Sequence, residues 1–99
     1  MLQDLTPSSF EENLGTRFHL HFGGEAPLEA ELFQVARHEE HDGPRKQPFS
    51  IFLRTPREIR TVLPQSIYRV EHDRLGTMDI FLVPVGPDEK GMRYEAVFN

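Results

Sequence analysis

The stretch from Leu63 to Gly86, LPQSIYRVEHDRLGTMDIFLVPVG, constrains the fold more than any other part of the chain. Two strand-like runs, Ser66 to Glu71 and Thr77 to Val85, flank a polar turn that ends in glycine. The second run contains Ile80-Phe81-Leu82-Val83 and is apolar on both faces, which predicts a central strand covered on both sides. Because an isolated hairpin is only marginally stable in water, the other segments are expected to pack against this one.

The remaining segments predict a single β-rich domain over residues 1–99. Alternating or continuous apolar residues predict six strands, at 16–22, 28–37, 48–54, 66–71, 77–85 and 93–98. Thr6 followed by Pro7 predicts a short helix over 7–14, with Phe10 and Leu14 plugging one end of the sheet and Gly15 capping the helix. The spacing contains no strand–helix–strand unit, so the fold class is mainly β, with antiparallel strands forming a small barrel or sandwich.

Two irregularities are expected within the strands. After Leu32 the apolar pattern slips, because Phe33 and Val35 fall on the opposite parity. A bulge near Leu32-Phe33 would explain this slip, and so would a strand that crosses from one sheet to another. Pro84 lacks a backbone N–H, so Val83-Pro84-Val85 is expected at a strand end, an edge or a bulge.

Composition and charge exclude several classes of function. The chain has no cysteine, which rules out disulfides, thiolate zinc sites and a cysteine nucleophile. It shows neither a signal-peptide pattern nor an apolar run of about 20 residues, so a cytoplasmic location without membrane contact is expected. The formal net charge of -5 argues against nucleic acid as a partner. Six acids and one base lie in residues 25–42, and five bases and one acid in 45–60, which predicts cross-strand ion pairs or, alternatively, two patches that orient a partner.

Candidate chemistry is sparse. His19 and His21 lie two residues apart on one predicted strand, so their side chains share a face and could begin a metal site. The alternative is that they are polar residues on a solvated face, and the chain fixes no further ligand, so no cofactor is expected. His38 and the acids after it lie in a predicted loop, and Ser50 lies inside a strand. With no nucleophile elbow and no phosphate-binding loop, the chain is not expected to be an enzyme.

The aromatic residues suggest a surface instead. Phe33 and Phe52 stand on the parity opposite to the main apolar set. They are expected to build a second core layer or, failing that, to form an exposed adhesive patch. Together with a sheet edge at Val83-Pro84-Val85, they are the predicted interaction residues. An uncovered edge could also pair with its own copy and form a homo-oligomer.

Short strings spread over the chain resemble a family of small bacterial single-domain proteins of unknown function. These strings are Phe10…Asn13-Leu14-Gly15-Thr16…Phe18, Pro48-Phe49-Ser50, Leu63-Pro64-Gln65…Tyr68, Leu75-Gly76, Phe81-Leu82-Val83-Pro84-Val85-Gly86 and Tyr94-Glu95-Ala96-Val97-Phe98-Asn99. Such proteins are encoded near phage-tail-collar-like proteins, so the resemblance implies a structural or accessory role with a collar-like or tail-like partner. The expected function is therefore a non-enzymatic protein-interaction module, and the alternative is a small-molecule or metal-binding barrel that uses His19 and His21.

Overall fold

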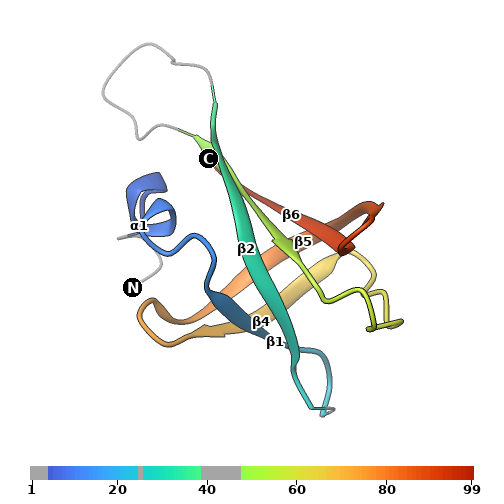
Figure 1. The fold of residues 1–99 in the computed structure, drawn as a ribbon. Coiled ribbons are helices and arrows are strands. Elements are labelled where there is room, and N and C mark those ends of the chain that lie inside the picture. Colours follow the sequence, from blue (N-terminus) through green and yellow to red (C-terminus); the bar gives the residue numbers. More distant parts are fainter. Residues whose placement is uncertain (1–4, 25, 39–47) are drawn as a thin grey trace.

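The computed structural model describes residues 5–24, 26–38 and 48–99. Its elements are α1 (Pro7–Glu11), β1 (Arg17–His21), β2 (Leu28–Arg37), β3 (Phe49–Arg54), β4 (Ser66–His72), β5 (Gly76–Asp88) and β6 (Gly91–Phe98). The strands are antiparallel and close into one barrel in the order β1-β2-β3-β6-β5-β4 (Figure 1). This confirms the mainly β class with six strands and one short helix, and the closure selects the barrel over the sandwich.

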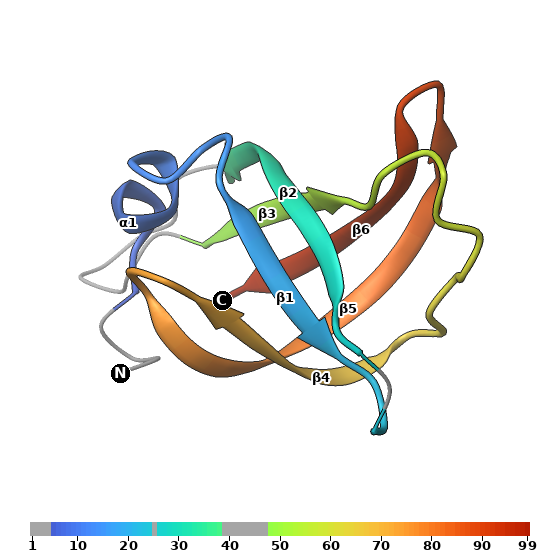
Figure 2. The ribbon, with the colours of Figure 1, turned by 60° about the horizontal axis from the view of Figure 1, so that its bottom comes forward.

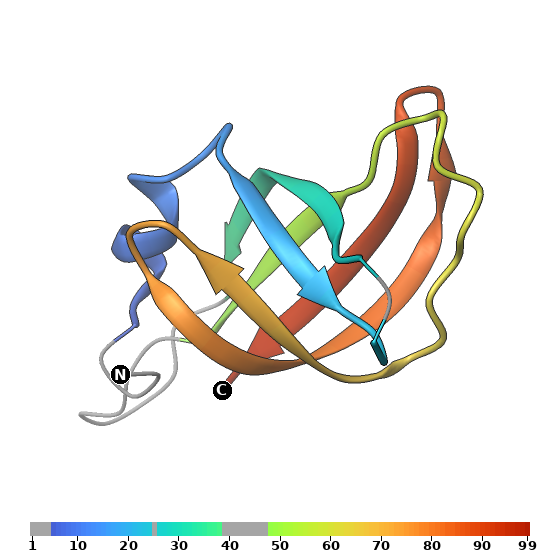
Figure 3. The same cartoon turned by 90° about the horizontal axis from the view of Figure 1, so that it is seen from below.

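The chain follows a Greek-key path. The strands β1, β2 and β3 are neighbours in order, and a long connector over residues 55–65 then carries the chain to β4, which lies beside β1. Figure 2 shows this connector at the end of the barrel opposite to α1. The β4–β5 turn points toward α1, as Figure 3 also shows. The two ends of the barrel are therefore closed by different devices, a helix at one end and a connector at the other.

One hydrophobic core fills the barrel. Alternate residues of every strand point inward, and the buried apolar set is Phe10, Phe18, Leu20, Leu28, Ala30, Leu32, Phe49, Ile51, Leu53, Leu63, Tyr68, Val70, Met78, Ile80, Leu82, Tyr94 and Ala96. Phe33 and Phe52 are absent from this set, so the predicted second core layer is wrong. Within the described ranges, no helix is long and apolar enough to span a bilayer.

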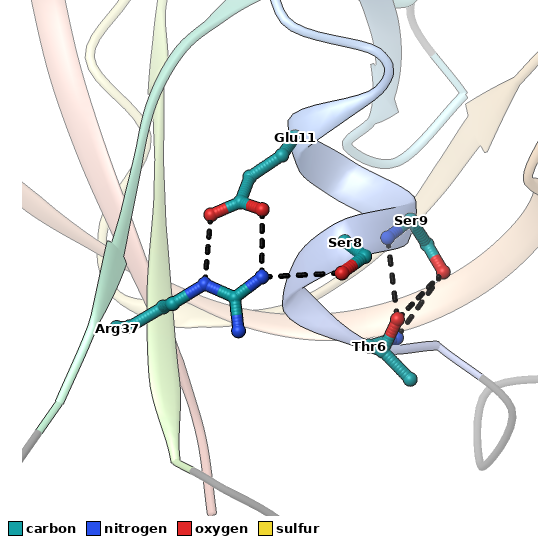
Figure 4. A network of polar contacts seen from close by, with 5 residues as sticks. All are labelled: Thr6, Ser8, Ser9, Glu11 and Arg37. Atoms are coloured by element: carbon teal, nitrogen blue, oxygen red, sulfur yellow. Dashed lines mark hydrogen bonds and ion pairs between the residues drawn. The ribbon is translucent and has the colours of Figure 1, made fainter.

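The helix begins where the sequence predicted it and ends earlier. Thr6 and Ser9 form a reciprocal capping box, in which the Ser9 N–H donates to Thr6 Oγ1 and the Thr6 N–H donates to Ser9 Oγ (Figure 4). The Asn13 side-chain amide donates to the Ser9 carbonyl at 2.8 Å and takes the acceptor that an α-helix would give to the Asn13 backbone. The helix therefore stops at Glu11, and the predicted extension to Leu14 is wrong. Leu14 is 47% exposed, so only Phe10 of the predicted pair plugs the barrel.

An ion pair fixes the helix to the end of β2. Arg37 donates from Nε and Nη2 to the two carboxylate oxygens of Glu11, at 3.0 and 2.7 Å, and from Nη2 to Ser8 Oγ (Figure 4). The hydrogen bonds from Arg37 lower the pKa of the Glu11 carboxyl. Gly15, predicted as the helix cap, instead donates its N–H to the Leu32 carbonyl and begins the pairing of the chain with β2.

Both predicted strand irregularities are present as bulges. The β2–β3 register shifts between Leu32 and Gln34, so Phe33 is the extra residue. The β5–β6 register shifts between Pro84 and Gly86, which makes Val85 the extra residue there. Because all six strands belong to one closed sheet, the alternative of a strand crossing between two sheets is wrong.

Two tyrosines attach the 55–65 connector to the barrel. The Leu63 N–H donates to the Tyr94 hydroxyl at 2.9 Å, and the Tyr68 hydroxyl donates to the carbonyl of Pro64, four residues earlier. The second bond has the pattern of a tyrosine corner, in which a strand tyrosine bonds the backbone a few residues upstream. The Leu-Pro-Gln…Tyr string is thus explained by scaffold geometry.

Replacing Tyr94 with phenylalanine is expected to destabilise the protein by about 1–3 kcal/mol, because it leaves the buried Leu63 N–H without an acceptor. Tyr68→Phe is the matched control. It removes the bond to the Pro64 carbonyl, but Pro64 is exposed and water can replace the donor, so the loss is expected to be smaller. Urea titration measures both; equal losses would contradict this assignment.

Candidate functional site

The two strand histidines face outward, as predicted, and each contacts a glutamate. His19 Nε2 lies 3.4 Å from Glu29 Oε2 on β2, and His21 Nε2 lies 2.7 Å from Glu71 Oε1 on β4. The two contacts go to opposite neighbours of β1, so they do not converge on one point. In the parts of the chain that the structure describes, no group of three or more His, Cys, Asp or Glu side chains is placed to hold a metal ion.

A serine–histidine contact joins β3 to the end of β2. His38 Nε2 lies 2.8 Å from Ser50 Oγ, and the His38 N–H donates to the Pro48 carbonyl. Ser50 is fully buried, so its hydroxyl is shielded from any substrate in this arrangement. The contact fits a structural role for Ser50. The acids that follow His38 in the predicted loop lie outside the described residues.

The charged segments lie side by side where the structure describes them. Glu31 of β2 is opposite to Arg54 of β3 in the strand register. Arg17 bonds Glu29 at 3.0 Å and Arg54 bonds Asp88 at 2.9 Å, while the charged residues between 39 and 47 lie outside the described residues. A hollow of about 160 Å³ between these pairs is also lined by Glu31 and Lys90. It mixes both signs of charge, so it gives no strong field for a ligand of either sign.

Phe33 and Phe52 form a pair on the outside of the barrel. Their ring centroids are 6.2 Å apart, and both residues are half-buried. The Arg54 guanidinium lies 4.1 Å from the Phe33 ring centroid while it also bonds Asp88. The two rings are thus covered in part by each other and by an arginine of their own chain. Less of their apolar surface is therefore free to contact a partner.

Val83-Pro84-Val85 lies where β5 extends past the end of its pairing with β4, next to a bulge. The barrel is closed, and Val83 and Pro84 pair with Glu95 and Tyr94 of β6. The last β4–β5 pair joins Ser66 to Leu82, so these residues pair with β6 alone over a short overhang. Pro84 cannot donate and the bulge interrupts the strand, which are two devices that blunt an edge. Self-association through this segment stays a prediction.

Several exposed apolar side chains lie on the outer face of β4, β5 and β6, while others, such as Val62 and Leu14, lie outside the strands. Ile67 on β4 and Phe81 on β5 are direct cross-strand partners and are 66% and 51% exposed. Val83 follows Phe81 by two residues on the same face, and Val97 follows Glu95, the cross-strand partner of Val83, by two residues on β6. Val97 is 54% exposed. We call Ile67, Phe81, Val83 and Val97 the outer apolar patch.

The outer apolar patch corrects the prediction of a β5 covered on both sides. Ile80 and Leu82 lie in the core at 3% and 0% exposure, whereas Phe81 between them points to solvent. The sequence does contain a signal for this patch, because the run Ile80-Phe81-Leu82-Val83 is apolar on both faces of the strand. Periodicity alone assigns such a strand to the interior, because it does not distinguish a covered outer face from a bare one.

The comparisons with known proteins identify a family. Residues 5–98 match the family described as "Domain of unknown function (DUF6916)". Neither the curated proteins nor the solved structures contain a significant match to this chain. Since the match spans nearly the whole sequence, the chain belongs to the DUF6916 family of domains of unknown function.

Proposed function

We propose that this protein is a non-enzymatic protein-binding module whose contact surface is the outer apolar patch. The observation that carries the proposal is that β5 is apolar on both faces while its outer face lies in solvent. Phe81, 51% exposed, occupies a position where an ordinary solvated strand would carry a polar side chain. Burying the exposed half of this side chain against a partner would stabilise a complex by roughly 1–1.5 kcal/mol.

The surroundings of the patch fit an interface. An exposed Arg69–Asp79 pair, with Nε and Oδ1 3.7 Å apart, lies beside Ile67 and Phe81, and Glu95 lies beside Val83. An apolar centre with a charged, solvated rim is the usual anatomy of a protein–protein contact. The patch also lies on regular strands of a closed barrel, so binding would require little ordering of the backbone.

The partner we propose is a collar-like or tail-like structural protein encoded by the same genome. The support for this choice is the resemblance to bacterial proteins encoded near phage-tail-collar-like proteins. Such a partner would make the chain an accessory of a larger assembly.

Phe81→Ser is expected to weaken partner binding by about 30-fold or more, the loss typical of a central contact residue. The unfolding midpoint should change little, because the side chain is half exposed and lies outside the core. The measurement is a pull-down from lysate of the source organism, followed by titration with the purified partner.

Gln34→Ser is the matched control, because Gln34 is exposed on β2, three strands away from β5 around the barrel. It also lies next to Phe33, so it reports on the Phe33–Phe52 surface. Equal capture by wild type, Phe81→Ser and Gln34→Ser would show that the patch is not the contact surface. A pull-down that recovers no consistent partner would count against a binding function altogether.

A further inference from the structure

His72 holds the β4–β5 turn from within the structure. The residue is 6% exposed, and its ring centroid lies 4.4 Å from that of Phe18 on β1. Its Nδ1 accepts hydrogen bonds from the backbone N–H groups of Arg74 and Leu75, at 3.0 and 3.1 Å. Its Nε2 lies 2.8 Å from Thr16 Oγ1.

These contacts determine the protonation state of the ring. A backbone N–H only donates, so Nδ1 must present its lone pair and the proton of the neutral ring is on Nε2. The Nε2–H then donates to Thr16 Oγ1, and the Thr16 hydroxyl donates to the Asn13 carbonyl at 2.6 Å. One chain of hydrogen bonds therefore joins the β4–β5 turn to the loop that follows α1.

We propose that His72 is a pH-sensitive latch between the β4–β5 turn and the loop of residues 12–16. Protonation adds a hydrogen to Nδ1, which can then no longer accept from Arg74 and Leu75 and faces two donor groups instead. The turn must release the protonated ring, and release also breaks the bond to Thr16. Acidification would thus loosen the barrel at the end where α1 and the β4–β5 turn meet.

The charges around the ring do not offset this effect. A hollow beside His72 is lined by Arg17 and His19 of β1, Glu29 of β2, and Asp73 and Arg74 of the turn. Burial is the main cause that lowers the pKa of His72 below its ordinary value of 6.5. Arg74 and His19 lower the pKa further, while Asp73 raises it.

The direction of the pH effect follows from this lowered pKa. When His72 is freed, its ring takes up a proton near pH 6.5, whereas the latched ring stays neutral to a lower pH. The latch is therefore at full strength above about pH 7.5 and weakens as the pH falls below 6.5. In that range the opening equilibrium should shift by up to about tenfold per pH unit.

The test is an NMR titration of the full chain, combined with hydrogen exchange. The ring nitrogen shifts should show the Nε2–H form at pH 8 and protonation below pH 6.5. The protection factors of the Arg74 and Leu75 amides should fall as the pH falls, while the amide of Ile80 in β5 keeps its protection.

Two substitutions separate the roles of the ring nitrogens. His72→Asn retains a short-range acceptor for the Arg74 and Leu75 amides but cannot titrate, so their protection should become independent of pH. His72→Gln retains a donor toward Thr16 but loses that acceptor, so protection should be low at every pH.

Three results would overturn the latch. The first is an Nδ1–H ring at neutral pH, and the second is unchanged Arg74 and Leu75 protection while His72 becomes protonated. The third is an acid-dependent loss of protection in His72→Asn that equals the loss in wild type.

Discussion

Replacing Gly91 with alanine is expected to lower the free energy of unfolding by about 3 kcal/mol or more. A Cβ at this position would lie 1.7 Å from the carbonyl oxygen of Thr55, and backbone atoms cannot give way as a flexible side chain would. The residue also has a φ of +154°, a conformation that L residues rarely adopt. Backbone strain of about 1–3 kcal/mol adds to an overpacking cost of about 1–3 kcal/mol.

Gly91 lies directly against the backbone of Thr55, the first residue of the 55–65 connector. The Thr55 N–H donates to the Met92 carbonyl at 2.9 Å, and Thr55 is fully buried. The β5–β6 turn is itself closed by Asp88, whose Oδ1 accepts from the backbone N–H groups of Lys90 and Gly91. Any shift that relieves an added methyl group would therefore disturb both the connector and the turn.

Gly24→Ala separates crowding from backbone conformation. Gly24 also has a positive φ, +86°, but a Cβ added there would meet no atom within 4 Å, so its substitution should cost only about 1–2 kcal/mol. Urea titration at an unchanged m-value gives both losses. Equal losses in the two variants would show that the contact with Thr55 contributes nothing.

Phe10→Ala is expected to destabilise the protein by about 3–5 kcal/mol, the usual cost of removing a buried aromatic ring. Phe10 is fully buried, and its ring centroid lies 6.3, 5.8 and 5.5 Å from those of Phe18, Phe49 and Phe98. Removing it leaves a cavity between the helix and the end of the barrel.

Leu14→Ala is the control for the packing of Phe10 into the end of the barrel. Leu14 lies four residues after Phe10, a helical spacing that predicts both residues on one buried face, yet it is 47% exposed. Its substitution should change the stability by less than about 1 kcal/mol. A loss in Leu14→Ala comparable to that in Phe10→Ala would mean that the helix extends as the sequence predicted.

Local chemistry explains which parts of the fold could be predicted from the sequence. The strands, the helix start at Thr6 and the bulges at Phe33 and Val85 all depend on a few neighbouring residues. Closure of the barrel depends on the pairing of β1 with β4, whose residues are about fifty positions apart, and no local pattern determines it. The connection between β5 and β6 is shorter than the gap between the predicted strands 77–85 and 93–98. The sequence does not indicate this, because the Asp88 side chain that closes the turn looks in the sequence like any loop acid.

The candidate site shows the same limit. Val83 was nominated from the sequence, but as part of a sheet edge, while Ile67, Phe81 and Val97 were not nominated because apolar strand residues are normally assigned to a core. His72 falls between the predicted strands 66–71 and 77–85 and therefore within the predicted polar turn, whereas in the structure it ends β4 with its side chain buried. Its partner, Thr16, is 56 positions away, so its burial and bonding became visible only in the fold.

Binding of another protein by the outer apolar patch is tested most directly by site-specific photo-crosslinking. A photoreactive phenylalanine analogue is placed at position 81 in one variant and at position 34 in another, and both are expressed in the source organism. We expect a discrete crosslinked partner from position 81 and none from position 34. A partner crosslinked from position 34 but not from position 81 would contradict the claim and move the binding surface to the Phe33–Phe52 side of the barrel.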